Sequence, residues 1–132
     1  MRFELHAHTA ENDICVKMKA ADIVAAYHEK GYQGIVITNH YFDLSLDWYR
    51  DELAGCGHEG IIDFYLRGYR LAREAGERLG MTVLPGMELR FDGTINDYLV
   101  YGIDEAFLYR TPLLNTLNLD SFLPLLEPGE LV

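Results

Sequence analysis

Three short apolar runs of this sequence each end in side chains that bind divalent metals. The first run leads into His6 and His8, the second into His40 and the third into Glu88. In parallel α/β folds the strands are apolar runs buried on both faces, and functional side chains collect at their C-terminal ends. Side chains two residues apart on a strand point to the same side, so the imidazoles of His6 and His8 are expected to converge. The pattern predicts a metal centre with imidazole and carboxylate ligands.

Strand-like and helix-like segments alternate along the chain in the predicted order β-α-β-α-β-β-α. Apolar residues recur at helical spacing over residues 20–27 and 61–79, and a glycine follows each stretch. Residues 41–60 are expected to form an elaborated loop beside the site, with one or two helical turns. Asp120 is expected to cap a last helix over residues 121–126. Strands are predicted over residues 3–5, 34–38, from 81 onward and 97–101.

The composition restricts the partners of such a centre. The chain has 132 residues and a formal net charge of -10. This predicts one domain and disfavours binding to nucleic acid or an anionic membrane, since both draw affinity from clustered Lys and Arg. The two cysteines lack metal-binding or disulfide-framework spacing, and no apolar run approaches the ~20 residues that span a bilayer. We expect a cytoplasmic protein without a membrane or nucleic-acid partner.

Several segments form an ordered series of motifs. They are His6-Ala7-His8-Thr9, Asp13, Thr38-Asn39-His40, Gly86-Met87-Glu88 and Gly102-Ile103-Asp104. The series resembles the successive motifs of the polymerase and histidinol phosphatase (PHP) family of metal-dependent phosphoesterases. The resemblance implies an α/β fold of the distorted β/α-barrel type, up to three divalent ions and hydrolysis of phosphate esters.

The resemblance implies a first and a second metal. His6, His8 and Glu88 match ligands of the first, and Glu88 also bridges to the second. Asp97 stands where the family has a histidine ligand of the second metal. A carboxylate at this position favours Mn²⁺, Mg²⁺ or Fe²⁺ relative to a nitrogen-rich zinc site, so the expected cofactors are divalent ions of Zn, Mn, Fe or Mg.

The resemblance also implies a third metal, for which Asp13 and His40 match ligands. Each candidate ligand has a structural alternative when its residue type is considered alone. Asp13 and Asp97 are of a type common in turns and caps, and His40 and Glu88 can cap a helix or bond a loop amide.

The resemblance covers the first half of the family domain. The family's later ligands, in a His-Pro motif and an Asp-x-His motif, have no counterpart, and residues 129–132 resemble the start of the strand before the His-Pro pair. We expect residues 1–132 to form the N-terminal part of a PHP-like domain, a truncated barrel of about four mainly parallel strands with flanking helices. The open edges of such a sheet favour a homodimer or a complementing second half of the domain.

Two functions are compatible with these residues. The first is hydrolysis of a small phosphate ester or nucleotide by metal-activated water, with His6, His8 and Glu88 on the catalytic ion and His40 as ligand or general acid. Arg90, two residues after Glu88, is a weaker candidate for a phosphate contact. The alternative is a non-catalytic metal-binding or oligomerisation module derived from a PHP phosphoesterase.

Overall fold

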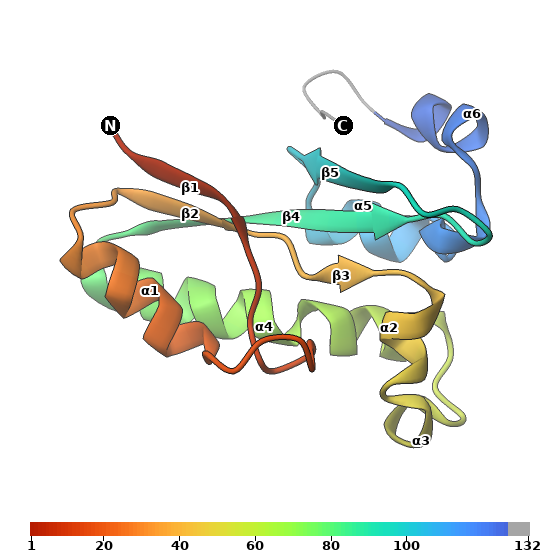
Figure 1. Cartoon of the computed structure of the whole chain (residues 1–132), viewed down its shortest axis with the longest axis horizontal. Helices are drawn as coiled ribbons and strands as arrows, with labels where there is room; N and C mark the ends of the chain where they lie inside the picture. Colours follow the sequence, from red (N-terminus) through yellow and green to blue (C-terminus); the bar gives the residue numbers. More distant parts are fainter. Residues whose placement is uncertain (127–132) are drawn as a thin grey trace.

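The computed structural model describes residues 1–126 and shows a mixed α/β fold with a curled, half-barrel sheet (Figure 1). The strands are β1 (Phe3–Ala7), β2 (Gly34–Ile37), β3 (His40–Tyr41), β4 (Thr82–Arg90) and β5 (Asp97–Tyr101). The helices are α1 (Ala20–Glu29), α2 (Asp43–Asp47), α3 (Arg50–Leu53), α4 (His58–Leu79), α5 (Glu105–Arg110) and α6 (Leu119–Phe122), with 3-10 turns η1 (Leu114–Thr116) and η2 (Leu123–Leu125). The predicted α/β class is confirmed. The strand predicted over residues 129–132 lies outside the described residues.

The strands β2 and β3 are two pieces of one interrupted strand. Gly34 pairs with Thr82 and His40 pairs with Glu88, so both pieces keep the same offset of 48 residues from β4. β1, β2, β3 and β4 run parallel, and β5 is antiparallel to β4. Counting β2 and β3 as one, the sheet has four mostly parallel strands, as predicted.

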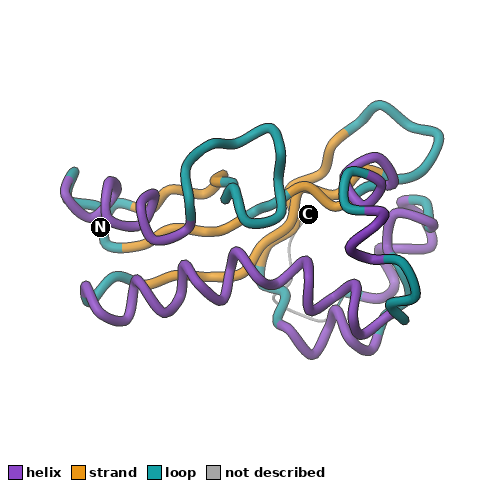
Figure 2. The backbone as a smooth tube through the Cα atoms, turned by 90° about the horizontal axis from the view of Figure 1, so that it is seen from below, coloured by secondary structure: helices purple, strands orange, loops and turns teal. Residues whose placement is uncertain are grey.

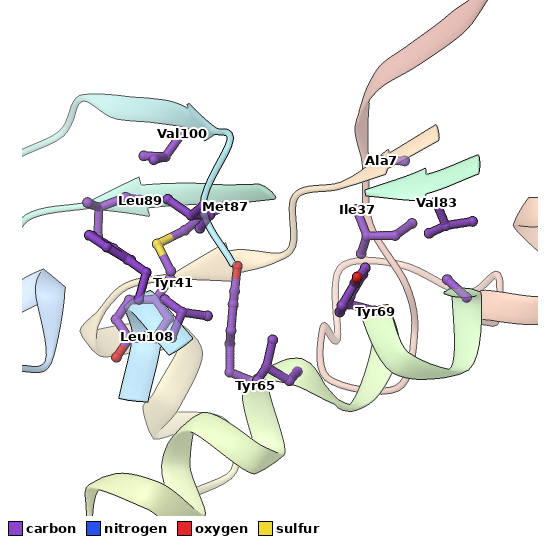
Figure 3. Close-up of a cluster of buried hydrophobic side chains, with 14 of the residues drawn as sticks. Ala7, Ile37, Tyr41, Tyr65, Tyr69, Val83, Met87, Leu89, Val100 and Leu108 are labelled. Carbon is purple, nitrogen blue, oxygen red and sulfur yellow. The ribbon is translucent and has the colours of Figure 1, made fainter. Parts of the chain in front are cut away.

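The helices α1 and α4 pack together below one face of the sheet (Figures 1 and 2). Figure 3 shows the core side chains between these layers, with Tyr65 pointing from α4 toward the sheet. α4 ends at Leu79 and is capped by Gly80, whose φ of 70° is left-handed and favours glycine. None of the helices in residues 1–126 combines the length and apolar character needed to cross a membrane.

The alternation of side chains separates the core face of the sheet from the site face. Tyr41, Met87 and Leu89 are buried in the hydrophobic core. His40 and Glu88 occupy the alternate positions of the same strands, so they point to the opposite face. On that face the Tyr101 hydroxyl of β5 donates to the Leu5 carbonyl of β1, with an oxygen-to-oxygen distance of 3.1 Å. This bond reaches across the intervening strands because the sheet is curled.

The segment between β2 and α4 agrees with the predicted loop except for one short strand. α2 and α3 are the one or two helical turns predicted there, whereas β3, which contains His40, is not predicted. α4 begins at His58, three residues before the predicted start. The helix thus extends further toward the N-terminus than predicted. Its N-cap is Gly57, which has the extended backbone typical of that position.

The C-terminal helices also differ from the prediction. α5 is absent from the predicted order, and it forms where the Asp104 carboxylate accepts a hydrogen bond from the Phe107 N–H at 2.7 Å. The last helix is capped by Asn118 and not by Asp120. The Asn118 side chain accepts a hydrogen bond from the Ser121 N–H, and the Ser121 hydroxyl accepts one from the Asn118 N–H. Six-residue and four-residue helices show no apolar period, so local capping decides where they begin.

The helix α4 passes close to the loop after β1 at Gly68. A Cβ atom at this position would lie 2.0 Å from Thr9 Oγ1, 2.6 Å from Asn12 Oδ1 and 2.9 Å from Asn39 Nδ2. No side chain fits at such distances. Glycine at position 68 therefore lets α4 pack directly beneath the polar residues that hold the loop.

We expect Gly68→Ala to lower the free energy of unfolding by about 1–3 kcal/mol, because the added methyl forces these buried groups apart. Urea unfolding followed by circular dichroism measures the change. Gly57→Ala is the matched control, since a Cβ at Gly57 meets no atom within 4 Å. The control should cost less than about 1 kcal/mol. Equal effects of the two substitutions would contradict the close packing at Gly68.

Candidate metal centre

The end of β1 carries an irregularity that aims two histidines at the site face. Glu4 pairs with Ile35 and Ala7 with Ile37, so three steps along β1 match two steps along β2. One extra residue in a strand bends it and redirects its side chains. The sequence predicts that His6 and His8 converge through regular strand alternation. In the structure they do reach the same point, but the irregularity in β1 contributes to their direction.

That point is one carboxylate oxygen of Glu88. Oε2 of Glu88 lies 2.7 Å from His6 Nε2, 3.0 Å from His8 Nε2 and 3.5 Å from His40 Nε2. The Glu88 side chain is largely buried, whereas His6 is exposed and the other two imidazoles are partly buried. Three elements that are distant in the sequence thus bring three ring nitrogens around one oxygen atom.

Asp13 forms the other half of the cluster. Its Oδ2 atom lies 2.6 Å from His40 Nδ1 and 3.1 Å from His8 Nδ1. Its Oδ1 atom accepts a hydrogen bond from the Cys15 N–H at 2.9 Å. The Asp13 side chain is 0% exposed. His8 and His40 are therefore each placed between two carboxylates, Asp13 on the Nδ1 side and Glu88 on the Nε2 side.

The buried pair of Asp13 and His40 shifts both pKa values. Burial raises the pKa of Asp13, but hydrogen bonds from His40 and His8 outweigh it and hold that pKa well below its usual value. Burial lowers the pKa of His40, but the hydrogen bond to Asp13 outweighs it and raises that pKa above 6.5. In the absence of a metal, Asp13 is thus ionised and favours the imidazolium form of His40.

A buried polar network supports the cluster from behind. The Asn39 side chain accepts from the Thr9 N–H at 2.7 Å and donates to Asn12 Oδ1 at 2.9 Å. Asn12 in turn donates to the Tyr65 carbonyl at 3.1 Å, and the Tyr65 hydroxyl donates to the Asn39 carbonyl at 3.0 Å. This network is not predicted from the sequence. Thr9 and Asn39 lie inside the metal motifs and offered a signal, whereas Asn12 and Tyr65 did not.

Aromatic side chains form one wall of the site. Phe42 and Trp48 pack edge to face against the His40 ring, with centroids 5.3 Å and 6.3 Å away. The Arg90 guanidinium lies 4.7 Å from the Phe42 ring centroid. The segment after β3 therefore lies beside the site, as predicted.

The structure brings five of the six predicted ligands together in two overlapping groups. One group is His6, His8 and Glu88, and the other is His8, Asp13 and His40; within each, the candidate ligand atoms lie within 4.8 Å of one another.

The sixth predicted ligand, Asp97, joins neither group among the described residues. Its two oxygens pair with Arg90, at 2.6 Å from Nε and 2.8 Å from Nη2. Asp97 and Arg90 face each other in the antiparallel register of β5 and β4, which explains the pairing. The same ion pair engages the guanidinium of Arg90, the weaker candidate for a phosphate contact. Neither residue's predicted role is tested by this geometry.

Comparison with known proteins adds no assignment. No protein-family model matches this chain, and no curated protein matches it.

We expect NMR titration of the metal-free protein, held in chelator, to give His40 a pKa above 6.5, and we expect Asp13→Asn to lower that pKa.

A raised imidazole pKa contributes stability that is complete below pH 6.5 and is lost as the pH rises through the raised value. The lowered pKa of Asp13 contributes stability above pH 3.8 that is lost as the pH falls through the lowered value. Unfolding free energy measured from pH 6 to 9 should therefore decline in the wild type. A wild-type His40 pKa at or below 6.5 would contradict the pairing.

Proposed function

We propose that this chain is a divalent-metal-dependent phosphoesterase of the PHP type, with His6, His8 and Glu88 as metal ligands. The observation that carries the proposal is the convergence of His6 Nε2 and His8 Nε2 on Glu88 Oε2, at 2.7 Å and 3.0 Å. Two imidazoles and one carboxylate, with an open side, form the ligand type of catalytic sites for divalent metals. The motif resemblance supports the same residues.

The surroundings of Glu88 fit a cation. An ionised carboxylate accepts hydrogen bonds and cannot donate them, so the Nδ1 atoms of His8 and His40 that face Asp13 must carry protons. With Nδ1 of His8 protonated toward Asp13, a neutral ring directs its Nε2 lone pair at Glu88 Oε2. A lone pair facing a carboxylate oxygen at 3.0 Å is unfavourable unless a cation or a second ring proton lies between them. A divalent ion held by these groups satisfies all of them at once.

The residues around this group suit a phosphate ester. When bound, the ion supplies Lewis-acid chemistry, lowering the pKa of water and neutralising charge on a phosphoryl group. His6 is exposed, so the site is open to a small ligand. The His40 ring lies beside the group and is fixed by Asp13 through Nδ1, so in the imidazolium form that Asp13 favours its Nε2–H can hydrogen-bond to an ester oxygen. Phe42 and Trp48 restrict the movement of His40.

Metal content and turnover test the proposal together. We expect the wild type to bind at least one Mn²⁺ or Zn²⁺ per chain and to hydrolyse an aryl phosphate ester. His6→Ala removes a ligand that belongs to the first group alone, so metal affinity and turnover should each fall by more than about 100-fold. His28→Ala is the matched control, because His28 is exposed on α1. Elemental analysis and release of the aryl alcohol measure the two quantities.

The outcomes separate the candidate functions. Bound metal with turnover, both lost in His6→Ala and kept in His28→Ala, supports the phosphoesterase. Bound metal without turnover on any phosphate ester refutes it and leaves the non-catalytic metal-binding module. Turnover that survives His6→Ala refutes the assignment of this ligand group.

A further inference from the structure

The two ligand groups share His8. One group uses His8 with His6 and Glu88, and the other uses it with Asp13 and His40. A neutral imidazole has one lone pair and one N–H, so it binds one ion through one nitrogen and donates through the other. If His8 Nε2 is a ligand on the Glu88 side, His8 Nδ1 is a hydrogen-bond donor to Asp13. The second group is then a set of hydrogen bonds instead of a second ion site.

The contacts of Asp13 agree with a hydrogen-bonding role. Oδ1 accepts from the Cys15 N–H at 2.9 Å, and Oδ2 lies 3.1 Å from His8 Nδ1 and 2.6 Å from His40 Nδ1. Both oxygens are thus engaged, and the side chain is 0% exposed. A carboxylate that holds the outer nitrogen of a ligating histidine fixes its tautomer and ring orientation, and raises its basicity as a ligand.

Asp13 acts on two rings at once. His8 follows β1 directly and His40 belongs to β3, and their ring centroids are 4.4 Å apart. Each ring presents Nδ1 to Asp13 and Nε2 to Glu88. The distance from Nε2 to Glu88 Oε2 is 3.0 Å for His8 and 3.5 Å for His40. One buried carboxylate therefore sets the direction in which both Nε2 atoms point.

We propose that Asp13 is a positioning residue, not a metal ligand, and that it orients His8 and His40 so that the chain binds a single ion on the Glu88 side. This inference rests on the proposed ligand group, but it concerns the number of ions and the role of Asp13. It differs from the third metal that the motif resemblance implies for Asp13 and His40.

The test combines metal counting with imidazole tautomers. Zn²⁺ content and affinity are measured by elemental analysis and chelator competition, and long-range ¹H–¹⁵N correlation NMR assigns the protonated nitrogen of each histidine. We expect one Zn²⁺ per wild-type chain, with His8 and His40 protonated at Nδ1. Asp13→Asn should still bind one Zn²⁺, about 10-fold to 100-fold more weakly. Asp104→Asn is the matched control with unchanged affinity, because asparagine is an equally good N-cap for α5.

Opposite results would overturn the inference. Two Zn²⁺ in the wild type and one in Asp13→Asn would make Asp13 a ligand. So would an Asp13→Asn variant that binds no ion at any Zn²⁺ concentration. An unchanged affinity in Asp13→Asn would remove its positioning role. If Asp13→Asn does not fold, the wild-type ion count and tautomers decide alone, since two ions or an Nε2–H His8 refute the proposal. A single bound ion without turnover refutes the phosphoesterase and leaves the role of Asp13 intact.

Discussion

Two buried carboxylates impose the constraint on which the rest of the site depends. Asp13 is fully buried and Glu88 is almost fully buried. Burying an unpaired charge costs several kcal/mol. The chain meets this cost by placing His8 and His40 between them, so each ring contacts both carboxylates. These contacts between imidazoles and carboxylates hold three elements together: β3, β4 and the loop that follows β1. They act at a place that the apolar core does not reach.

The sheet is built to accommodate that cluster. At the interruption between β2 and β3, the Asn39 carbonyl accepts from both the Glu88 N–H of β4 and the Tyr65 hydroxyl, while the Asn39 side chain accepts from the Thr9 N–H. The offset to β4 stays constant across the break, so His40 still lands directly opposite Glu88. Gly68 completes the arrangement because its missing side chain lets α4 approach this network. The break in the strand therefore leaves the register that aligns His40 with Glu88 undisturbed.

Local signals predict the elements that are long or strongly apolar. β2 and the long helix α4 were predicted within a few residues, since burial and amphipathic spacing repeat over several turns or residues. β3 and α5 were not predicted, because two and six residues contain too little pattern. β3 exists only by pairing with β4, and α5 begins where the Asp104 side chain caps it. Short elements of this kind are decided by a single contact.

The sequence by itself determined that four of the cluster residues would meet: the spacing of His6 and His8, and the strand positions of His40 and Glu88, predict one shared site because parallel strands bring their ends together. Only the tertiary structure decided how they are used. It joins Asp97 to Arg90 instead of either ligand group, and it turns both nitrogens of His8 toward different carboxylates. Such choices depend on distances of a few tenths of an ångström and on which partner already occupies an oxygen, and no linear spacing contains that information.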